Sequence, residues 1–230
     1  MLNIQQYAAI WDVDGTLVDT AELHFNAWER LCRELGRPFS RADFAATFGK
    51  RNPEIFLQLF GPVFSAARID ELGTRKEDYY KDAARAGVAL LPGARRLLLE
   101  LHAAGFRQAI GSSAPRGNVD LILKLTETEG LFQAISSAED TTRGKPDPQV
   151  FLVAAERLQV APANCVVFED AVAGVEAARA GGMKCVAVSF VGHHPADKLR
   201  AAGADLVVPT LEKISVADVQ RLYSSTSPPL

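Results

Sequence analysis

Two carboxylates one residue apart, Asp12 and Asp14, directly follow an apolar run in the segment WDVDGT (residues 11–16). Side chains alternate along a strand, so the two can share one face if the extended conformation persists between them. An aspartate that attacks phosphorus needs a cation to offset its repulsion from the phosphate, and the leaving alkoxide needs a proton donor. Asp12 could be that nucleophile and Asp14 that donor. An isolated Asp-x-Asp-Gly is more often only a strand end and a turn, so this interpretation needs support elsewhere in the chain.

The composition restricts the class of protein. The chain has 230 residues, of which 48% are hydrophobic and 23% charged, and its formal net charge is −3. This length allows one core, or a core with a small inserted domain. No run of Lys and Arg could follow a nucleic acid backbone, and no stretch approaches the ~18 to 20 apolar residues of a membrane span. We therefore expect a cytoplasmic monomer with neither nucleic acid nor a membrane as partner.

Apolar runs of strand length alternate with helical patterns over most of the chain. Strands are expected at residues 7–11, 108–111, 133–136, 165–168, 185–188 and 205–208, and helices at 94–104, 148–158, 172–180, 195–202 and 211–222. This alternation predicts an α/β fold with a parallel sheet flanked by helices and right-handed crossovers.

The segment after the first strand has a different pattern. It carries helical patterns at residues 23–35, 53–60 and 66–86, with no convincing strand among them. We therefore predict a core formed by residues 1–21 and 90–230, and a small helical domain inserted at residues 22–89.

Polar residues follow several of the apolar runs. Ligands of an open parallel sheet bind beyond the carboxyl ends of its strands, where Ser112, Ser113, Lys145, Glu169 and Asp170 are expected. Each has an ordinary interpretation: the serines could cap the next helix, the lysine could be solvated, and the acidic pair could lie on the surface or cap a helix. They could instead form an anion site, a cation that offsets phosphate charge and holds the nucleophile ionised, and a magnesium site.

These residues form four motifs, which follow one another along the chain as Asp12-x-Asp14, Ser112, Lys145 and Glu169-Asp170. Together they resemble the four motifs of the haloacid dehalogenase superfamily. The segments GKPDP (144–148) and FEDAVAGVEAA (168–178) are especially similar to the subfamily with a small helical cap, which includes β-phosphoglucomutase and many sugar-phosphate and phosphoglycolate phosphatases. The resemblance implies a Rossmann-like core, a four-helix-type cap, a phosphoaspartyl intermediate and one Mg²⁺ ion.

The resemblance also implies roles for the phosphate-binding and catalytic residues. Asp12 would attack, Asp14 would be the general acid and base, and Ser112 with Lys145 would bind the phosphoryl group, with Ser113 beside them. The dehalogenases lack the second aspartate of the first motif, because a leaving halide needs no proton. The presence of Asp14 therefore favours phosphoryl transfer.

The implied Mg²⁺ ligands are Asp12, the main-chain carbonyl of Asp14, and Asp170. Glu169 is left with three possible roles, as a direct ligand, as a ligand through water, or as an orienting partner of Lys145.

Three residues in or just before the predicted cap resemble functional positions of β-phosphoglucomutases. Thr20 and His24 match a hinge threonine and a histidine that couple cap closure to catalysis. His24 also shares a helical stripe with apolar residues, which would make it an ordinary packed histidine. Lys76 matches a cap lysine that meets substrate, although most lysines on helices face solvent.

The charged residues that would bind a second phosphate, distant from Asp12, differ from those of the mutase. Phe48 stands where the mutase has a lysine, and Asn52 falls near the mutase's arginine, so Lys50 or Arg51 would have to replace the lost charge. Residues 114–115 are Ala-Pro where the mutase has Ser-Lys.

Arg116 is the only cation near residues 114–115, where the sequence also departs from that of the mutase. A mutase must hold a bisphosphate at both ends and exclude water, whereas a phosphatase needs one phosphate site and an admitted water. We therefore predict a Mg²⁺-dependent phosphatase of a small phosphorylated metabolite, such as a sugar or polyol phosphate. β-Phosphoglucomutase is the alternative. A non-catalytic phosphate-binding protein is disfavoured, because it would need neither a nucleophile nor an acid.

Overall fold

A computed structural model describes residues 7–224, and within them the strands form one six-stranded parallel sheet in the order β3-β2-β1-β4-β5-β6. The strands are β1 (Ala8–Trp11), β2 (Arg107–Gly111), β3 (Ala134–Ser136), β4 (Cys165–Glu169), β5 (Lys184–Val188) and β6 (Leu206–Val208). Each lies within one residue of the prediction at either end. The predicted α/β class is confirmed.

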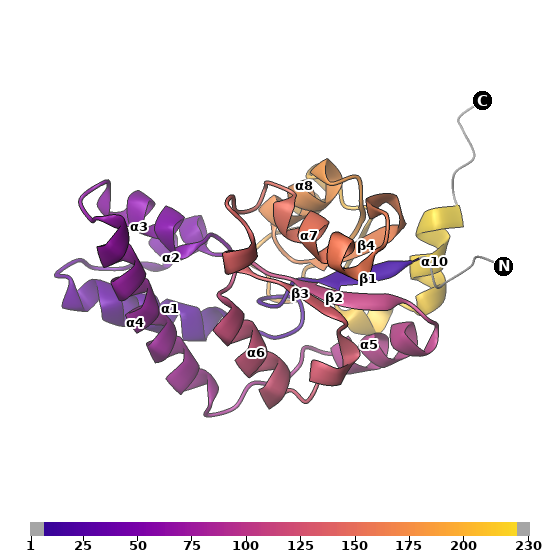
Figure 1. Cartoon of the computed structure of the whole chain (residues 1–230), viewed down its shortest axis with the longest axis horizontal. Coiled ribbons are helices and arrows are strands. Elements are labelled where there is room, and N and C mark those ends of the chain that lie inside the picture. Colours follow the sequence, from indigo (N-terminus) through magenta and orange to yellow (C-terminus); the bar gives the residue numbers. More distant parts are fainter. Residues whose placement is uncertain (1–6, 225–230) are drawn as a thin grey trace.

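Helices cover both faces of this sheet (Figure 1). They are α5 (Ala94–Ala103), α6 (Arg116–Leu125), α7 (Gln149–Leu158), α8 (Val172–Ala180), α9 (Ala196–Ala201) and α10 (Val216–Ser224). Side chains alternate along β1 and therefore pack against helices on opposite faces of the sheet. Ala9 and Trp11 pack in the hydrophobic cluster that includes α5, α6 and α10. Ala8 and Ile10 pack in the cluster that includes α7, α8 and α9. All four side chains of β1 are fully buried.

Four helices between β1 and β2 form a separate group at one end of the molecule (Figure 1). They are α1 (Ala21–Glu34), α2 (Arg41–Thr47), α3 (Asn52–Phe60) and α4 (Ala66–Ala84), and we call them the helical insertion. The insertion has its own buried cluster around Trp28, Phe56 and Leu72. The exact domain limits, residues 22–89 against 1–21 and 90–230, remain a prediction.

The structure differs from the sequence-based elements at three places. Helix α6 had been expected only as the helix that the serines could cap, without a range. Helix α2 was not expected, since seven residues are too few for a clear period; Ser40 and Asp43 begin it by a reciprocal capping box. The helix predicted at 211–222 is divided into a short 3-10 turn and α10, because Ser215 and Asp218 exchange hydrogen bonds that start a new helix. The 3-10 turns are η2 (Glu129–Leu131), η3 (Ala138–Asp140), η4 (Pro162–Asn164) and η5 (Leu211–Lys213).

The central position of β1 places its carboxyl end between those of β2 and β4. The backbone N–H of Asp12 still donates to the Phe168 carbonyl (3.0 Å), so the ladder continues one residue past β1. The chain then turns at Gly15, whose φ is +89°. A Cβ there would lie 2.1 Å from Asp170 Oδ2, so this turn requires glycine. The first and last predicted motifs are thus brought into contact.

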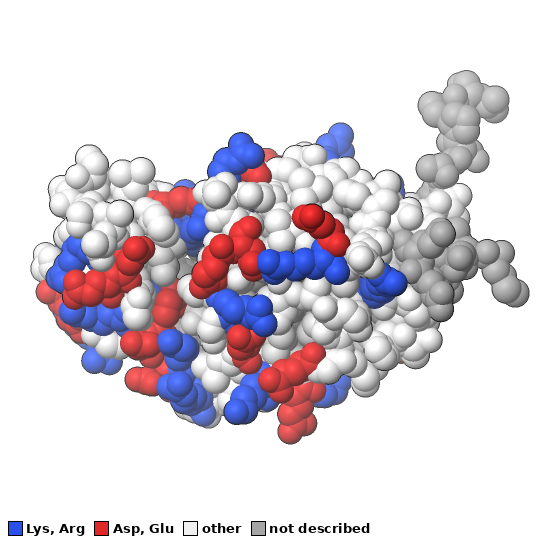
Figure 2. All heavy atoms as spheres, in the orientation of Figure 1, with Lys and Arg blue, Asp and Glu red and all other residues white. Residues whose placement is uncertain are grey.

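The charged side chains are mixed over the surface. On the face shown in Figure 2, Lys and Arg are interspersed with Asp and Glu over both the insertion and the sheet region. Among residues 7–224 we find no helix with the length and apolar character that crossing a membrane requires.

Gln108 on β2 is a polar residue that the sheet needs. It is fully buried, its Oε1 accepts from the Trp11 indole N–H (3.1 Å), and its Nε2 donates to the Leu98 carbonyl (3.1 Å). Gln108→Met should lower the free energy of unfolding by about 1–3 kcal/mol, because the Trp11 indole N–H becomes buried without a hydrogen bond. Urea unfolding measures this, with Gln58→Met on the exposed face of α3 as control. An unchanged unfolding midpoint would contradict the prediction.

Candidate active site

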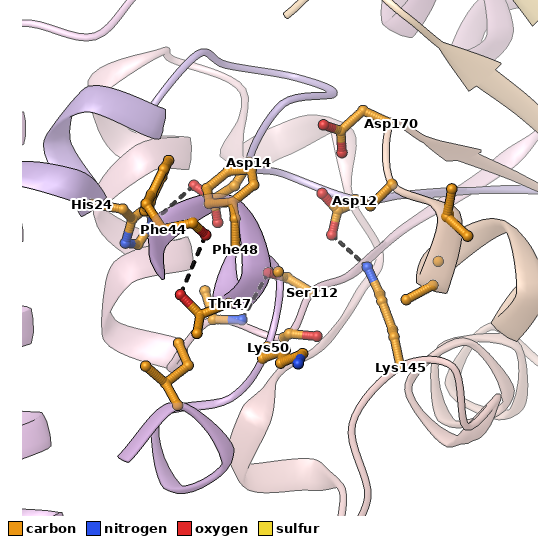
Figure 3. Close-up of a pocket in the computed structure, with 18 of the residues that line it drawn as sticks. Asp12, Asp14, His24, Phe44, Thr47, Phe48, Lys50, Ser112, Lys145 and Asp170 are labelled. Carbon is orange, nitrogen blue, oxygen red and sulfur yellow. Dashed lines mark hydrogen bonds and ion pairs between the residues drawn. The ribbon is translucent and has the colours of Figure 1, made fainter. Parts of the chain in front are cut away.

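A cavity of about 300 Å³ lies between the carboxyl ends of the strands and the helical insertion (Figure 3). It brings together most of the site residues predicted from sequence, which are Asp12, Asp14, Ser112, Ser113, Lys145, Glu169 and Asp170 from the sheet side and His24, Lys50 and Lys76 from the insertion. The cavity thus lies where a ligand of a parallel sheet is expected, beyond the carboxyl ends of the strands.

Lys145 connects two buried carboxylates in this cavity. Its Nζ donates to Asp12 Oδ1 (2.6 Å) and to Glu169 Oε1 (2.7 Å), and only 5% of its side chain is exposed. Burial raises the pKa of Asp12 to about 8, against the opposing effect of Lys145, and the charges of Glu169 and Asp14 add to the rise. Burial would lower the pKa of Lys145, but the two carboxylates outweigh it and raise that pKa. The lysine therefore remains a cation beside Asp12.

Both oxygens of Glu169 already have protein partners. Oε1 accepts from Lys145, and Oε2 accepts from the backbone N–H groups of Asp170 and Ala171, each at 2.6 Å. A Cβ on Gly174 would lie 1.7 Å from Oε1, so α8 can approach the carboxylate only because that residue is glycine. Of the three roles open to Glu169, this geometry supports that of orienting partner for Lys145.

Asp12 and Asp170 offer hard oxygen ligands at one end of the cavity, where Figure 3 shows them close together. Burial and then the charges of Glu169 and Asp12 raise the pKa of Asp170 well above its ordinary value. A divalent cation would offset this repulsion. Within residues 7–224 no group of three or more His, Cys, Asp or Glu side chains has the arrangement of a metal site. Two carboxylates still fit Mg²⁺, which usually keeps waters and binds substrate phosphate as well.

Asp14 is held from the insertion side. Its Oδ1 accepts a short hydrogen bond from the Thr20 hydroxyl and lies 3.3 Å from His24 Nε2. Burial alone would raise the pKa of Asp14, but His24 and Thr20 together bring it below its ordinary value. The other ring nitrogen of His24, Nδ1, lies 2.8 Å from Lys76 Nζ, and the ring stacks on Tyr80 with centroids 4.2 Å apart. His24 is therefore both packed and in contact with Asp14.

Of the four cations predicted to contact substrate, Lys50 and Lys76 line the cavity, whereas Arg51 and Arg116 do not. Lys76 is 2% exposed, so it does not face solvent. Lys50 lines the cavity and donates to Gln58 Oε1 (2.6 Å). Arg51 donates across to the Ala138 carbonyl (3.0 Å) and does not line this cavity, and neither does Arg116, which pairs with Asp120 (2.8 Å). The predicted substrate contacts of Arg51 and Arg116 are thus unsupported in this arrangement.

Several cavity residues were not foreseen from sequence. His194 follows β5, so the strand-end rule would have found it had that strand been included. Trp28 and Thr47 line the insertion side, where no pattern distinguishes them from ordinary helix residues. Glu77 stands next to Lys76 in α4, and adjacent helix positions normally point in different directions.

The family model of the haloacid dehalogenase-like hydrolases matches residues 9–188, which include every one of the four motifs. The chain belongs to this family. It is accordingly an enzyme of the phosphatase or phosphoglucomutase kind, and the resemblance seen in the sequence is confirmed.

Relatives in this family include both kinds of enzyme. The chain is 35% identical to the β-phosphoglucomutase of Bacillus subtilis, over 87% of this chain and 88% of that protein. It is 30% identical to a phosphorylated carbohydrates phosphatase of Thermotoga maritima, over 91% and 97%. A CbbY variant from Rhodobacter sphaeroides, solved in complex with xylulose-(1,5)-bisphosphate, superposes with a TM-score of 0.81 at 25% identity, over 92% of this chain and 97% of that one.

The close approach of α8 to Glu169 can be tested by one methyl group. Gly174→Ala places a Cβ against Glu169 Oε1, so the carboxylate must move and Lys145 loses its orientation. We expect kcat/KM for p-nitrophenyl phosphate to fall by roughly tenfold or more, as expected for a misplaced group at a reacting centre. Gly117→Ala in α6 is the matched control, since its Cβ would meet nothing within 4 Å. Equal rates for the two variants would contradict the orienting role.

Proposed function

We propose that this enzyme is a Mg²⁺-dependent phosphatase of small phosphorylated metabolites, such as sugar or polyol phosphates, and that it acts through a phosphoaspartyl intermediate. The observation that carries the proposal is the pairing of buried Asp12 with the Lys145 cation in a cavity that Asp14 also lines. Lys145 opposes the rise that burial causes in the pKa of Asp12, and a bound Mg²⁺ would favour its ionised, nucleophilic form further. Asp14 is a separate carboxyl group available for proton transfer.

In the first step a carboxylate oxygen of Asp12 attacks phosphorus, and the bond between phosphorus and the substrate oxygen breaks. The leaving oxygen takes a proton from the carboxyl form of Asp14. In the present contacts with Thr20 and His24 the carboxylate form of Asp14 is favoured, so the acid role requires that these contacts change when substrate binds.

In the second step water attacks the phosphoryl group on Asp12 and releases inorganic phosphate and the free carboxylate. Asp14, now ionised, takes the proton from that water, and the contacts with Thr20 and His24 suit this form. Lys145 offsets phosphoryl charge in both steps, and the Ser112 and Ser113 segment lies at the start of α6, where backbone N–H groups can bind an anion.

Asp12, Asp170 and the main-chain carbonyl of Asp14 would hold the Mg²⁺ ion. When bound, the ion would supply positive charge that lets an anionic nucleophile approach an anionic phosphate. Glu169 keeps Lys145 directed at Asp12 and is not needed as a direct ligand. The monomeric state and the cytoplasmic location stay predictions.

β-Phosphoglucomutase is the second candidate, and the Bacillus subtilis relative favours it. So does the contact chain from Asp14 through His24 to Lys76, which links the insertion to the proton-transfer residue. Against it, Arg51 and Arg116 lie outside the cavity, so few cations remain there for a second phosphate.

The phosphatase proposal predicts metal-dependent turnover that needs Asp12. Purified protein should release p-nitrophenol from p-nitrophenyl phosphate with Mg²⁺ and not with EDTA, and Asp12→Asn should reduce kcat by roughly 10³-fold or more, because the amide is not a nucleophile. Asp120→Asn, on the exposed face of α6, should retain wild-type turnover. Turnover by Asp12→Asn at the wild-type rate would contradict the phosphoaspartyl route.

The mutase alternative predicts a different balance of products. β-Glucose 1-phosphate with a trace of glucose 1,6-bisphosphate should yield inorganic phosphate and glucose if the enzyme is a phosphatase, because water accepts the phosphoryl group. Enzymatic assays of glucose 6-phosphate and of phosphate measure the two outcomes together. Glucose 6-phosphate formed without matching inorganic phosphate would overturn the preference for hydrolysis.

A further inference from the structure

The far end of the catalytic cavity contains a buried carboxylate, Glu77 of α4, of which 6% is exposed. Its Oε1 accepts from Asn52 Nδ2 (2.8 Å) and its Oε2 from Asn118 Nδ2 (2.6 Å). Lys76 Nζ lies 3.1 and 3.2 Å from the two oxygens. Glu77 thus joins two helices of the insertion, α3 and α4, to helix α6 of the sheet region.

Glu77 stands between two cavities. It lines the catalytic cavity and also a second cavity of about 440 Å³ at the junction of the insertion with the sheet region. Asn52, Ser113 and Pro115 line both cavities with it. This group of residues therefore forms the wall where the catalytic cavity ends.

Glu77 neutralises the positive charge of Lys76 at this wall. Burial would raise its pKa, but Lys76, His24 and the two asparagines lower it below the ordinary value, so the group is a carboxylate. It offsets the charge of Lys76, a buried cation that lines the same cavity. The amide nitrogens of Asn52 and Asn118 are directed at Glu77, so these donors serve the carboxylate already.

A second phosphate would meet unfavourable surroundings at this wall. A phosphate is doubly charged near neutral pH, and Glu77 cancels the attraction that Lys76, 3.1 Å away, would otherwise exert on it. Hydroxyl groups would fit better, because they can donate to carboxylate and amide oxygens and carry no charge.

We infer that Glu77 is a specificity-determining residue that selects phosphate monoesters with an uncharged, hydroxyl-bearing far end and disfavours bisphosphates. This inference rests on the proposed phosphatase function and names its substrate class. The enzyme would then differ from the CbbY relative, which was solved with a bisphosphate.

The test compares kcat/KM for matched pairs: fructose 1-phosphate and 6-phosphate against the 1,6-bisphosphate, and ribulose 5-phosphate against the 1,5-bisphosphate. Released inorganic phosphate is measured with Mg²⁺. The wild type should prefer the better monophosphate of a pair by about tenfold or more, since Glu77 leaves Lys76 with no net attraction for a second phosphate. Glu77→Gln should reduce that preference by at least about fivefold, because the neutralising charge is lost and Lys76 is freed.

Asp70→Asn is the matched control, since it removes the same charge from the same helix at a residue that lines only the second cavity. It should leave the preference unchanged. Asn52→Arg is a second variant in case Glu77→Gln does not fold: a cation beside Glu77 should also weaken the preference, and this position is only half-buried.

The outcomes separate this inference from the proposed function. Turnover of p-nitrophenyl phosphate without a monophosphate preference in any pair contradicts the inference alone. A preference that persists in both Glu77→Gln and Asn52→Arg assigns Glu77 a purely structural role and also overturns it. Absence of Mg²⁺-dependent phosphate release from every ester contradicts the proposed function itself.

Discussion

One buried cation shared by two buried carboxylates organises the catalytic cavity. A charge removed from water is strongly unfavourable unless it is paired and hydrogen-bonded, and Lys145 satisfies this condition for Asp12 and Glu169 together. The three residues come from the segments after β1, after β3 and at the end of β4, so their pairing fixes three separate strand ends relative to one another. The proposed reactivity of Asp12 and the local packing thus depend on the same contact.

The sheet topology explains why so few residues suffice to build the site. β1 lies between β2 and β4, and all three are parallel, so Asp12, Ser112 and Glu169 reach the same edge without long loops. This arrangement can be predicted from the sequence. Apolar runs of strand length, each followed by polar residues, predict both the sheet and the edge at which ligands bind. This is why the strands and the core motifs were predictable almost residue by residue.

The helical insertion was predictable only in outline. Its apolar residues recur with the period of a helix, which predicts the helices themselves. The direction of a side chain in the insertion depends instead on how four short helices pack, and that packing is set by residues distant in the sequence. Lys76 shows the difficulty, since a lysine on a mostly polar helix is expected in solvent, yet it is buried beside His24 and Glu77. Arg51 shows the reverse: it was a candidate to replace a lost phosphate-binding charge, but it reaches a carbonyl of the sheet region instead of the cavity.

The separate hydrophobic cluster of the insertion has a consequence for the history of this protein. Because Trp28, Phe56 and Leu72 give the insertion a buried cluster of its own, residues on the cavity side of α3 can be exchanged with little effect on the strands next to Asp12, although Tyr80 and Ala84 of α4 pack in the cluster of the sheet. Selection can therefore alter which metabolite is accepted while the phosphoryl chemistry is inherited intact. A family built this way can diversify rapidly in substrate and stay uniform in mechanism.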